Sequence, residues 1–113
     1  LLEDGLYAME DDLKDPAFAD KMVRFVSASM KGWKYAIENP DEAAEIVMDN
    51  GGQDENHQKR MMGEVAKLIG EPDAKLIEAA YERTAKALLD QKIIENEPSG
   101  AWTSEITDKV TVE

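Results

Sequence analysis

A long amphipathic run bounded at both ends by proline constrains this sequence more than any other feature. Asp15-Pro16 precedes the run and Asn39-Pro40 follows it. Asp and Asn are good helix caps, and proline suits the first helical position because its missing N–H has no partner there. The pattern therefore predicts one long helix between the two prolines. Its expected inner face, at a spacing of three and four residues, consists of Phe18, Met22, Phe25, Val26, Ser29, Met30, Trp33, Ala36 and Ile37.

Two more helices are expected after Pro40. A short helix over residues 41–49 ends at the break Asn50-Gly51-Gly52. Asp54 is the expected cap of the next helix, and Gly70 closes it. The side chains expected to face inward are Ala44, Val47 and Met48 in the first, and Met61, Val65, Leu68 and Ile69 in the second.

Pro72 and Asp73 open a fourth helix that fades over residues 91–94 into the turn-rich loop 95–100. Trp102 and Thr103 are expected to start a last short helix that reaches about Val110. Trp102 is interpreted as an aromatic that packs this tail onto the body. The expected inner face of the fourth helix is Ile77, Ala80, Tyr81, Thr84 and Leu88.

The predicted fold class is mainly α, with about four to five helices and a short extended N-terminal segment. Leu1–Ala8 is interpreted as that extended segment, and no convincing strand pattern follows it. We expect one unit over 1–113, composed of an opening segment (1–14), a helical body (15–94) and a tail (95–113).

Composition excludes several classes of function. The 113 residues carry 13 Lys and Arg against 25 Asp and Glu, a net charge of −12. This charge argues against nucleic-acid binding, which needs clustered cations, and against an anionic membrane surface. The chain has no cysteine, so disulfides and thiolate chemistry are excluded. An apolar fraction of 42% is nevertheless typical of a folded chain.

No pattern in the sequence indicates catalysis, a cofactor or a metal site. His57 is the single histidine and lacks an evident orienting partner, so we interpret it as a solvated helix residue. The acidic stretches at 10–12 and 49–54 lack the ligand spacing of a calcium loop. We expect no enzyme activity, no cofactor and no bound metal.

The segment ASMKGWKYAIENPDEAA at residues 28–44 resembles extracytoplasmic solute-binding proteins of ABC importers. The similarity is greatest to the group that binds nitrate, sulfonates, taurine or thiamine-precursor pyrimidines. Further similar segments are Glu3–Ala8, Asp15–Phe18, Leu88–Ile94 and Gly100–Thr103, whereas Asn50–Gln53 departs from the family pattern.

The resemblance implies a fragment of a larger protein. Members of this family have a two-lobed α/β fold that closes on a ligand without chemistry, and this chain resembles the C-terminal part. The chain opens at Leu1 without a Met, which agrees with a fragment. The implied partners are a small molecule and ABC permease subunits, in a periplasmic or extracytoplasmic location. Produced alone, the fragment is expected to self-associate through uncovered apolar surface.

Ligand contacts in this family come from loops at strand ends, which makes the opening segment the best place to look. The resemblance therefore implies Glu3, Asp4 and Tyr7 as ligand-binding candidates. Tyr7 can stack on or hydrogen-bond to a small planar or anionic ligand, and a carboxylate can accept a hydrogen bond from a ring amine. The alternative is that Tyr7 is a core residue and that Glu3 and Asp4 are surface residues.

A helical adaptor of the tetratricopeptide type is the second hypothesis, because residues 36–43 resemble the junction between such repeats. A repeat array requires self-similarity at about 34 residues. No second Asn-Pro-Asp-Glu-Ala occurs at that distance. A third hypothesis is an enzyme of the thiamine-precursor branch, which would require a histidine-rich centre that this chain lacks.

Overall fold

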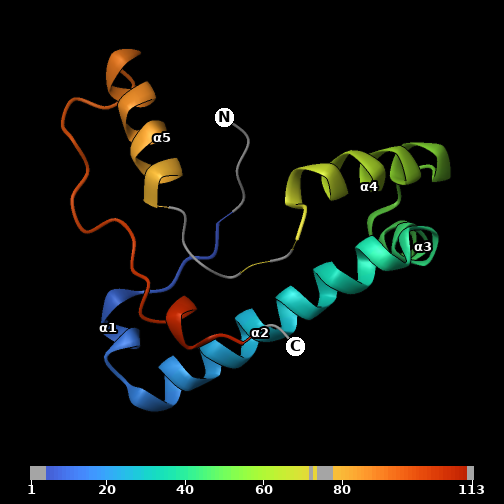
Figure 1. The fold of residues 1–113 in the computed structure, drawn as a ribbon, viewed down its shortest axis with the longest axis horizontal. Helices are drawn as coiled ribbons and strands as arrows, with labels where there is room; N and C mark the ends of the chain where they lie inside the picture. Colours follow the sequence, from blue (N-terminus) through green and yellow to red (C-terminus); the bar gives the residue numbers. More distant parts are fainter. Residues whose placement is uncertain (1–4, 72, 74–77, 112–113) are drawn as a thin grey trace. The chain divides into compact units, whose positions relative to one another are not determined.

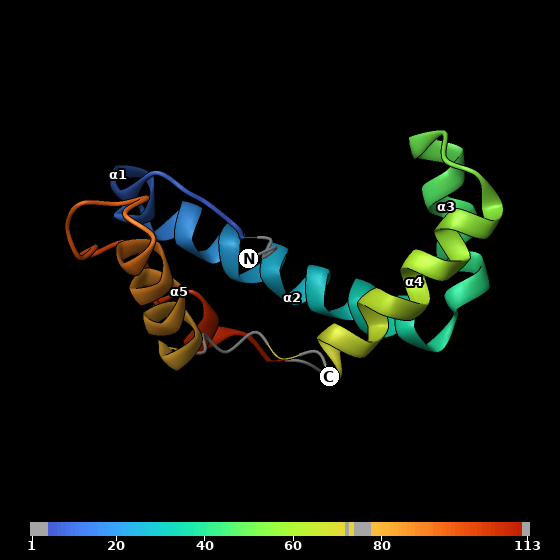
Figure 2. The same cartoon turned by 90° about the horizontal axis from the view of Figure 1, so that it is seen from above.

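The computed structural model describes residues 5–71, 73 and 78–111, most of which lie in helices (Figure 1 and Figure 2). No strand occurs among these residues. The mainly α fold class is therefore confirmed. The elements are α1 (Glu10–Leu13), α2 (Pro16–Glu38), α3 (Pro40–Gly51), α4 (Glu55–Ile69), α5 (Glu78–Asp90) and the 3-10 turn η1 (Thr107–Lys109).

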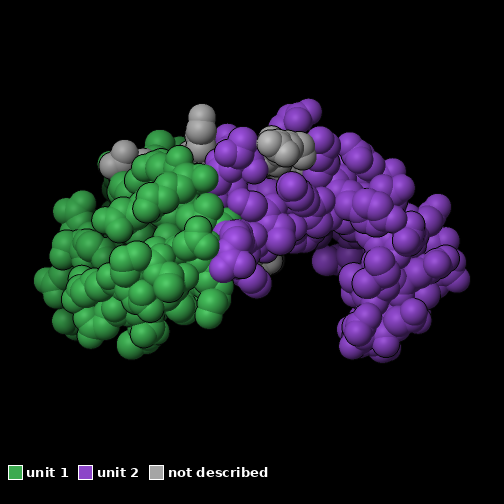
Figure 3. Space-filling view, turned by 90° about the horizontal axis from the view of Figure 1, so that it is seen from below, with its two compact units in different colours: residues 1–23, 75–109 green, residues 24–74, 110–113 purple. Residues whose placement is uncertain are grey.

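The chain divides into two compact units (Figure 3). Unit 1 consists of residues 1–23 and 75–109, and unit 2 consists of residues 24–74 and 110–113. Helix α2 contributes its first turns to unit 1 and its remainder to unit 2. The expected segment boundaries after residues 14 and 94 both lie within unit 1.

Helix α2 begins where the sequence predicts, because Asp15 caps it. The Asp15 Oδ1 atom accepts the N–H of Ala17 at 3.0 Å, and the Asp15 carbonyl accepts the N–H of Ala19 at 2.9 Å. Most of the predicted inner face is at least partly covered, and Val26 is buried. Phe25 and Trp33 are exceptions, at 53% and 38% exposure. The length and start of this helix are confirmed.

At the junction between α2 and α3, Asn39 performs a different task from the one predicted. It occupies the position before α3, but its side chain makes no capping bond there. Its backbone N–H (2.8 Å) and its side-chain Nδ2 (3.0 Å) instead both donate to the Tyr35 carbonyl at the end of α2. Pro40 then starts α3 directly. The chain turns sharply at this junction: Figure 1 shows α3 end-on, whereas α2 runs across the view.

Helix α4 packs back alongside α3, as Figure 2 shows. The buried side chains of α3 are Ala43 and Ala44, the latter only 2% exposed. Their small size lets the two helices approach closely. Met48 is half-buried as expected, but the prediction for Val47 is wrong, because 46% of its surface is exposed. Gly52 closes α3 in the left-handed conformation, with its N–H bound to the Met48 carbonyl.

The caps of α4 are confirmed, whereas half of its predicted inner face is wrong. Asp54 accepts the N–H of His57 at 2.9 Å, and Gly70 follows the last helical residue. Met61 and Leu68 are 45% and 86% exposed. The apolar arc of α4 is wider than the stripe that one neighbouring helix covers, so these two side chains fall outside it. The half-buried residues are Gln58, Met62, Val65, Ala66 and Ile69.

In unit 1, the tail packs against α5 through a contact between two aromatic rings. The rings of Tyr81 and Trp102 meet edge to face, with centroids 6.0 Å apart. This contact confirms that Trp102 packs the tail onto the body. Ala85 is the buried residue of α5, and the expected side chains Ala80, Tyr81, Thr84 and Leu88 are half-buried. Pro72, where this helix was expected to open, and the inward residue Ile77 lie outside the described residues.

The predicted last helix from Trp102 to Val110 is wrong. The element that forms there is the short turn η1 at Thr107–Lys109, with the N–H of Asp108 bound to the Ser104 carbonyl at 2.8 Å and the N–H of Lys109 bound to the Ile106 carbonyl at 3.1 Å. Thr103 Oγ1 accepts the N–H of Glu105 at 3.2 Å, the same spacing as the Asp15 cap of α2, but no α-helix follows it. The tail therefore remains largely irregular between α5 and η1.

The end of α5 is a Schellman motif with a lysine where glycine is usual. The N–H of Ile93 binds the Leu88 carbonyl and the N–H of Lys92 binds the Leu89 carbonyl, both at 2.9 Å. Lys92 has a φ of 56°. A side chain is strained in this left-handed conformation, whereas glycine is not.

Lys92→Gly is therefore expected to raise the free energy of unfolding by about 0.5–1 kcal/mol. Lys92→Ala is the matched control, because alanine removes the charge and keeps the strain. Urea unfolding followed by circular dichroism measures both variants. Equal stabilities for the two variants would contradict this account of the turn.

Ala44→Leu is expected to destabilise the chain by about 1–3 kcal/mol, since the larger side chain has no room between α3 and α4. Ala28→Leu is the control at an exposed helical position, with an expected change within about 0.5 kcal/mol. Thermal unfolding reports both values. If the two substitutions had equal effects, α3 and α4 would not be closely packed at this point.

Candidate functional site

The opening segment before α1 contains the ligand-binding residues implied by the resemblance. Glu3 and Asp4 lie outside the described residues. Tyr7 is 93% exposed. The structure therefore rules out the alternative that Tyr7 is a core residue, and it leaves the aromatic ring available to a partner.

The ring of Tyr7 folds back over the backbone of Gly5. A Cβ atom at residue 5 would lie 2.9 Å from the Tyr7 hydroxyl oxygen and 3.0 Å from the ring carbon that carries it. Any larger residue at position 5 would therefore displace the ring. The absence of a side chain at Gly5 permits the observed placement of Tyr7.

A shallow depression in unit 1 is a second candidate place for a ligand. Its volume is about 370 Å³, and it is open to solvent. Pro16, Ala19 and Val23 on the first turns of α2 supply apolar surface, and Asp20 and Lys109 supply one charge of each sign. Tyr7 is not among these lining residues. The sequence did not indicate this depression, because Lys109 lies far from α2 along the chain.

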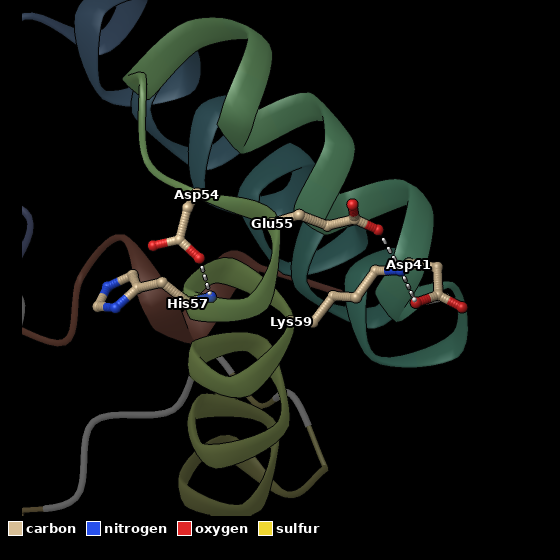
Figure 4. A network of polar contacts seen from close by, with 5 residues as sticks. All are labelled: Asp41, Asp54, Glu55, His57 and Lys59. Atoms are coloured by element: carbon tan, nitrogen blue, oxygen red, sulfur yellow. Dashed lines mark hydrogen bonds and ion pairs between the residues drawn. The ribbon is translucent and has the colours of Figure 1, made fainter.

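Charged side chains connect α3 and α4 in unit 2 (Figure 4). The Lys59 Nζ atom lies 2.7 Å from the Glu55 carboxylate one turn earlier and 3.5 Å from Asp41 on α3. The hydrogen bond to Glu55, followed by the charge of Asp41, raises the pKa of Lys59 above its ordinary 10.5. These groups are solvent-exposed, so they contribute little to stability.

His57 is placed as the sequence indicated, on the exposed surface of α4. Figure 4 shows its imidazole pointing away from the ion pairs of Lys59, while its backbone N–H binds Asp54. Within the described part of the chain, no cluster of three or more His, Asp or Glu side chains is placed to hold a metal ion.

Tyr35 and Glu42 connect α2 to α3 across the junction. The Tyr35 hydroxyl donates to Glu42 Oε2 at 2.6 Å. This hydrogen bond, with partial loss of solvent and the carboxylate charge, raises the pKa of Tyr35 above its ordinary 10.0. The sequence did not predict this contact. Tyr35 and Glu42 are seven residues apart on either side of a helix break, and the angle between the two helices cannot be derived from the sequence.

Comparison with protein-family models, with curated proteins and with solved structures gives no match to this chain. Among the helices that the structure describes, none combines the length and apolarity needed to cross a membrane.

The hydrogen bond between Tyr35 and Glu42 predicts that Tyr35 ionises at a higher pH than an ordinary tyrosine. The raised pKa means that the neutral phenol is favoured in the folded chain. The hydrogen bond from Tyr35 to Glu42 therefore contributes fully to the stability of the folded chain below pH 10.0. This contribution is lost as the pH rises through the raised pKa of Tyr35. Phenolate absorbance in the Tyr7→Phe/Tyr81→Phe background isolates Tyr35.

Glu42→Ala is expected to return the titration of Tyr35 to its ordinary range, whereas Glu45→Ala, three residues along α3, is expected to leave it raised. A Tyr35 that titrates alike in all three proteins would show that the hydroxyl does not bind Glu42 in solution.

Proposed function

We propose that this chain is the C-terminal portion of the substrate-binding component of an ABC importer. The protein captures a small molecule of the nitrate, sulfonate, taurine or thiamine-precursor class by closing a cleft, without chemistry. Closure requires only that the ligand bind the closed form more tightly than the open form.

The observation that carries this proposal is the fold of residues 28–44, the segment with the resemblance. This segment forms the end of α2, the junction and the start of α3. Three of its residues have a structural task there: Tyr35 bonds from α2 to Glu42 on α3, Asn39 bonds back to the end of α2, and Ala44 is buried on α3, which packs against α4. The resemblance thus falls on the junction between α2 and α3.

Exposed apolar side chains agree with a chain that is covered by further parts of a receptor. In unit 1, Leu6 and Met9 are 64% and 71% exposed, next to Tyr7. In unit 2, Leu68 is 86% exposed. Single exposed apolar residues are ordinary, but several on one short segment favour contact with another surface.

The ligand contacts of this proposal lie in the opening segment. Tyr7 offers a largely exposed ring and hydroxyl, and Glu3 and Asp4 complete the proposed set. The proposed partners are the small molecule and the permease subunits, and the proposed location is extracytoplasmic. The net charge of −12 remains an argument against nucleic acid as a partner.

A tetratricopeptide-like adaptor is the second candidate, because α3 and α4 form a packed helical pair. Such a pair is the unit of helical repeat proteins, which bind other proteins on a concave face. This alternative requires further helical pairs of the same kind, and the sequence shows no repeat of the junction.

Ligand-induced stabilisation of the full-length protein tests the proposal. Nitrate, taurine, an alkanesulfonate and a hydroxymethylpyrimidine are each added in a thermal-shift assay. One of them, at about 100 times its dissociation constant, is expected to add about 2.7 kcal/mol of stability. No stabilisation by any of the four at millimolar concentration would contradict the proposal.

Tyr7→Ala is expected to weaken that binding about tenfold, which corresponds to about 1.4 kcal/mol. The matched control is Tyr35→Ala, which removes an exposed tyrosine from the α2–α3 junction instead. If both variants bound equally well, the assignment of Tyr7 would be wrong while the receptor function would stand.

A further inference from the structure

We propose that Asn50 is a site of spontaneous deamidation, gated by the opening of the last turn of α3. The chain contains four asparagines, of which Asn50 alone precedes a glycine. Asn39 precedes proline, Asn56 precedes histidine and Asn96 precedes glutamate. This inference is independent of the proposed ligand and of the receptor function.

The chemistry needs no partner other than water. The backbone nitrogen of Gly51 attacks the side-chain carbonyl carbon of Asn50, and the bond to the side-chain nitrogen breaks, so ammonia leaves. Water then opens the resulting succinimide at either carbonyl, which gives aspartate or isoaspartate. Glycine favours the attack because it has no Cβ to obstruct the ring and permits the required backbone rotation.

The folded structure holds Asn50 in a conformation that does not react. Asn50 and Gly51 both belong to α3, so helical hydrogen bonding occupies the Gly51 nitrogen. The Asn50 Nδ2 atom donates to the Ile46 carbonyl at 2.8 Å, which turns the side chain back along the helix. Reaction therefore requires this last turn to open.

Opening of this turn is expected to be easy. Residues 49–52 are all exposed, and helix ends open at low free energy. The turn is closed by the bond from the Gly52 N–H to the Met48 carbonyl at 3.1 Å. Gly52 has a φ of 70°, and a Cβ there would meet no atom within 4 Å. A substitution at Gly52 therefore strains only the backbone.

Deamidation would in turn keep the turn open. It replaces an amide that donates to Ile46 with a carboxylate that cannot. The new charge also lies beside Asp49 at the negative end of the helix dipole. The modification thus converts an occasional opening into a lasting one and alters the connection from α3 to α4.

Mass spectrometry of the intact chain, incubated at pH 8 and 37 °C and then digested, tests the proposal. We expect a mass gain of about one dalton at Asn50, well ahead of any gain at Asn56 or Asn96. The rate is expected to be much higher in urea than in buffer. Equal rates at the three asparagines, or equal rates at Asn50 with and without urea, would overturn the proposal.

Two neighbouring glycines provide variants that separate the chemistry from the gating. Gly51→Ala is expected to slow the reaction both in buffer and in urea, because it obstructs the attack itself; its Cβ would lie 3.9 Å from Val47 and fits. Gly52→Ala is expected to speed the reaction several-fold in buffer and to leave it unchanged in urea. A Gly52→Ala rate equal to wild type in buffer would contradict gating by the helix turn.

The structural consequence is tested with Asn50→Asp. We expect faster amide exchange at Gly52 in this variant, whereas Asn56→Asp, on the first turn of α4, is expected to leave exchange at Gly52 unchanged. Unaltered exchange at Gly52 in Asn50→Asp would show that deamidation does not open the turn.

Discussion

The direct junction of α2 and α3 is the constraint on which unit 2 depends. Pro40 has no N–H and disfavours a helical conformation at the residue before it, so α2 ends there. The Tyr35 carbonyl keeps its helical partner, the backbone N–H of Asn39, and also accepts the Asn39 side chain, whereas Pro40 has no N–H to donate to the carbonyl of Ala36. With no loop between the helices, the direction of α3 is fixed relative to the adjoining turns of α2, and α4 packs against α3.

Small side chains make that packing possible. Among the described residues, the buried apolar side chains are Val26, Ala43, Ala44 and Ala85. Alanines allow close approach of helices but remove little apolar surface from water. Larger side chains such as Phe25, Ile46 and Leu68 remain substantially exposed. Close helix contacts and uncovered apolar faces therefore occur together, which agrees with a chain whose surfaces contact further protein.

Local signals in the sequence predicted the helix ends well. Asp15, Asp54 and Gly70 act within one turn of themselves, through hydrogen bonds or backbone conformation that neighbouring residues determine. The exception is the end of α3, which runs on to Gly51, past the break expected at Asn50. The covered face of each helix was harder to predict. Val47, Met61 and Leu68 fit an apolar stripe, but burial depends on how wide a strip the neighbouring helix covers. That width is a property of tertiary packing.

The polar contacts were the least predictable part. Asn39 donates to the Tyr35 carbonyl of α2, although its residue type and position suit an N-terminal cap of α3. Lys59 on α4 forms an ion pair with Asp41 on the neighbouring helix α3. Lys92 occupies a left-handed position that sequence patterns assign to glycine. For the candidate site, the sequence named Tyr7, and its exposure agrees with binding. The depression near Lys109 requires the fold to bring η1 to α2.

The proposed receptor function depends on closure of a cleft, and small-angle X-ray scattering of the full-length protein tests this closure most directly. Scattering is recorded with and without the molecule that stabilises the protein. If the protein is the proposed receptor, its radius of gyration is smaller with ligand, because two lobes would close around the ligand. A protein that binds the ligand at an unchanged radius of gyration would contradict the proposed closure.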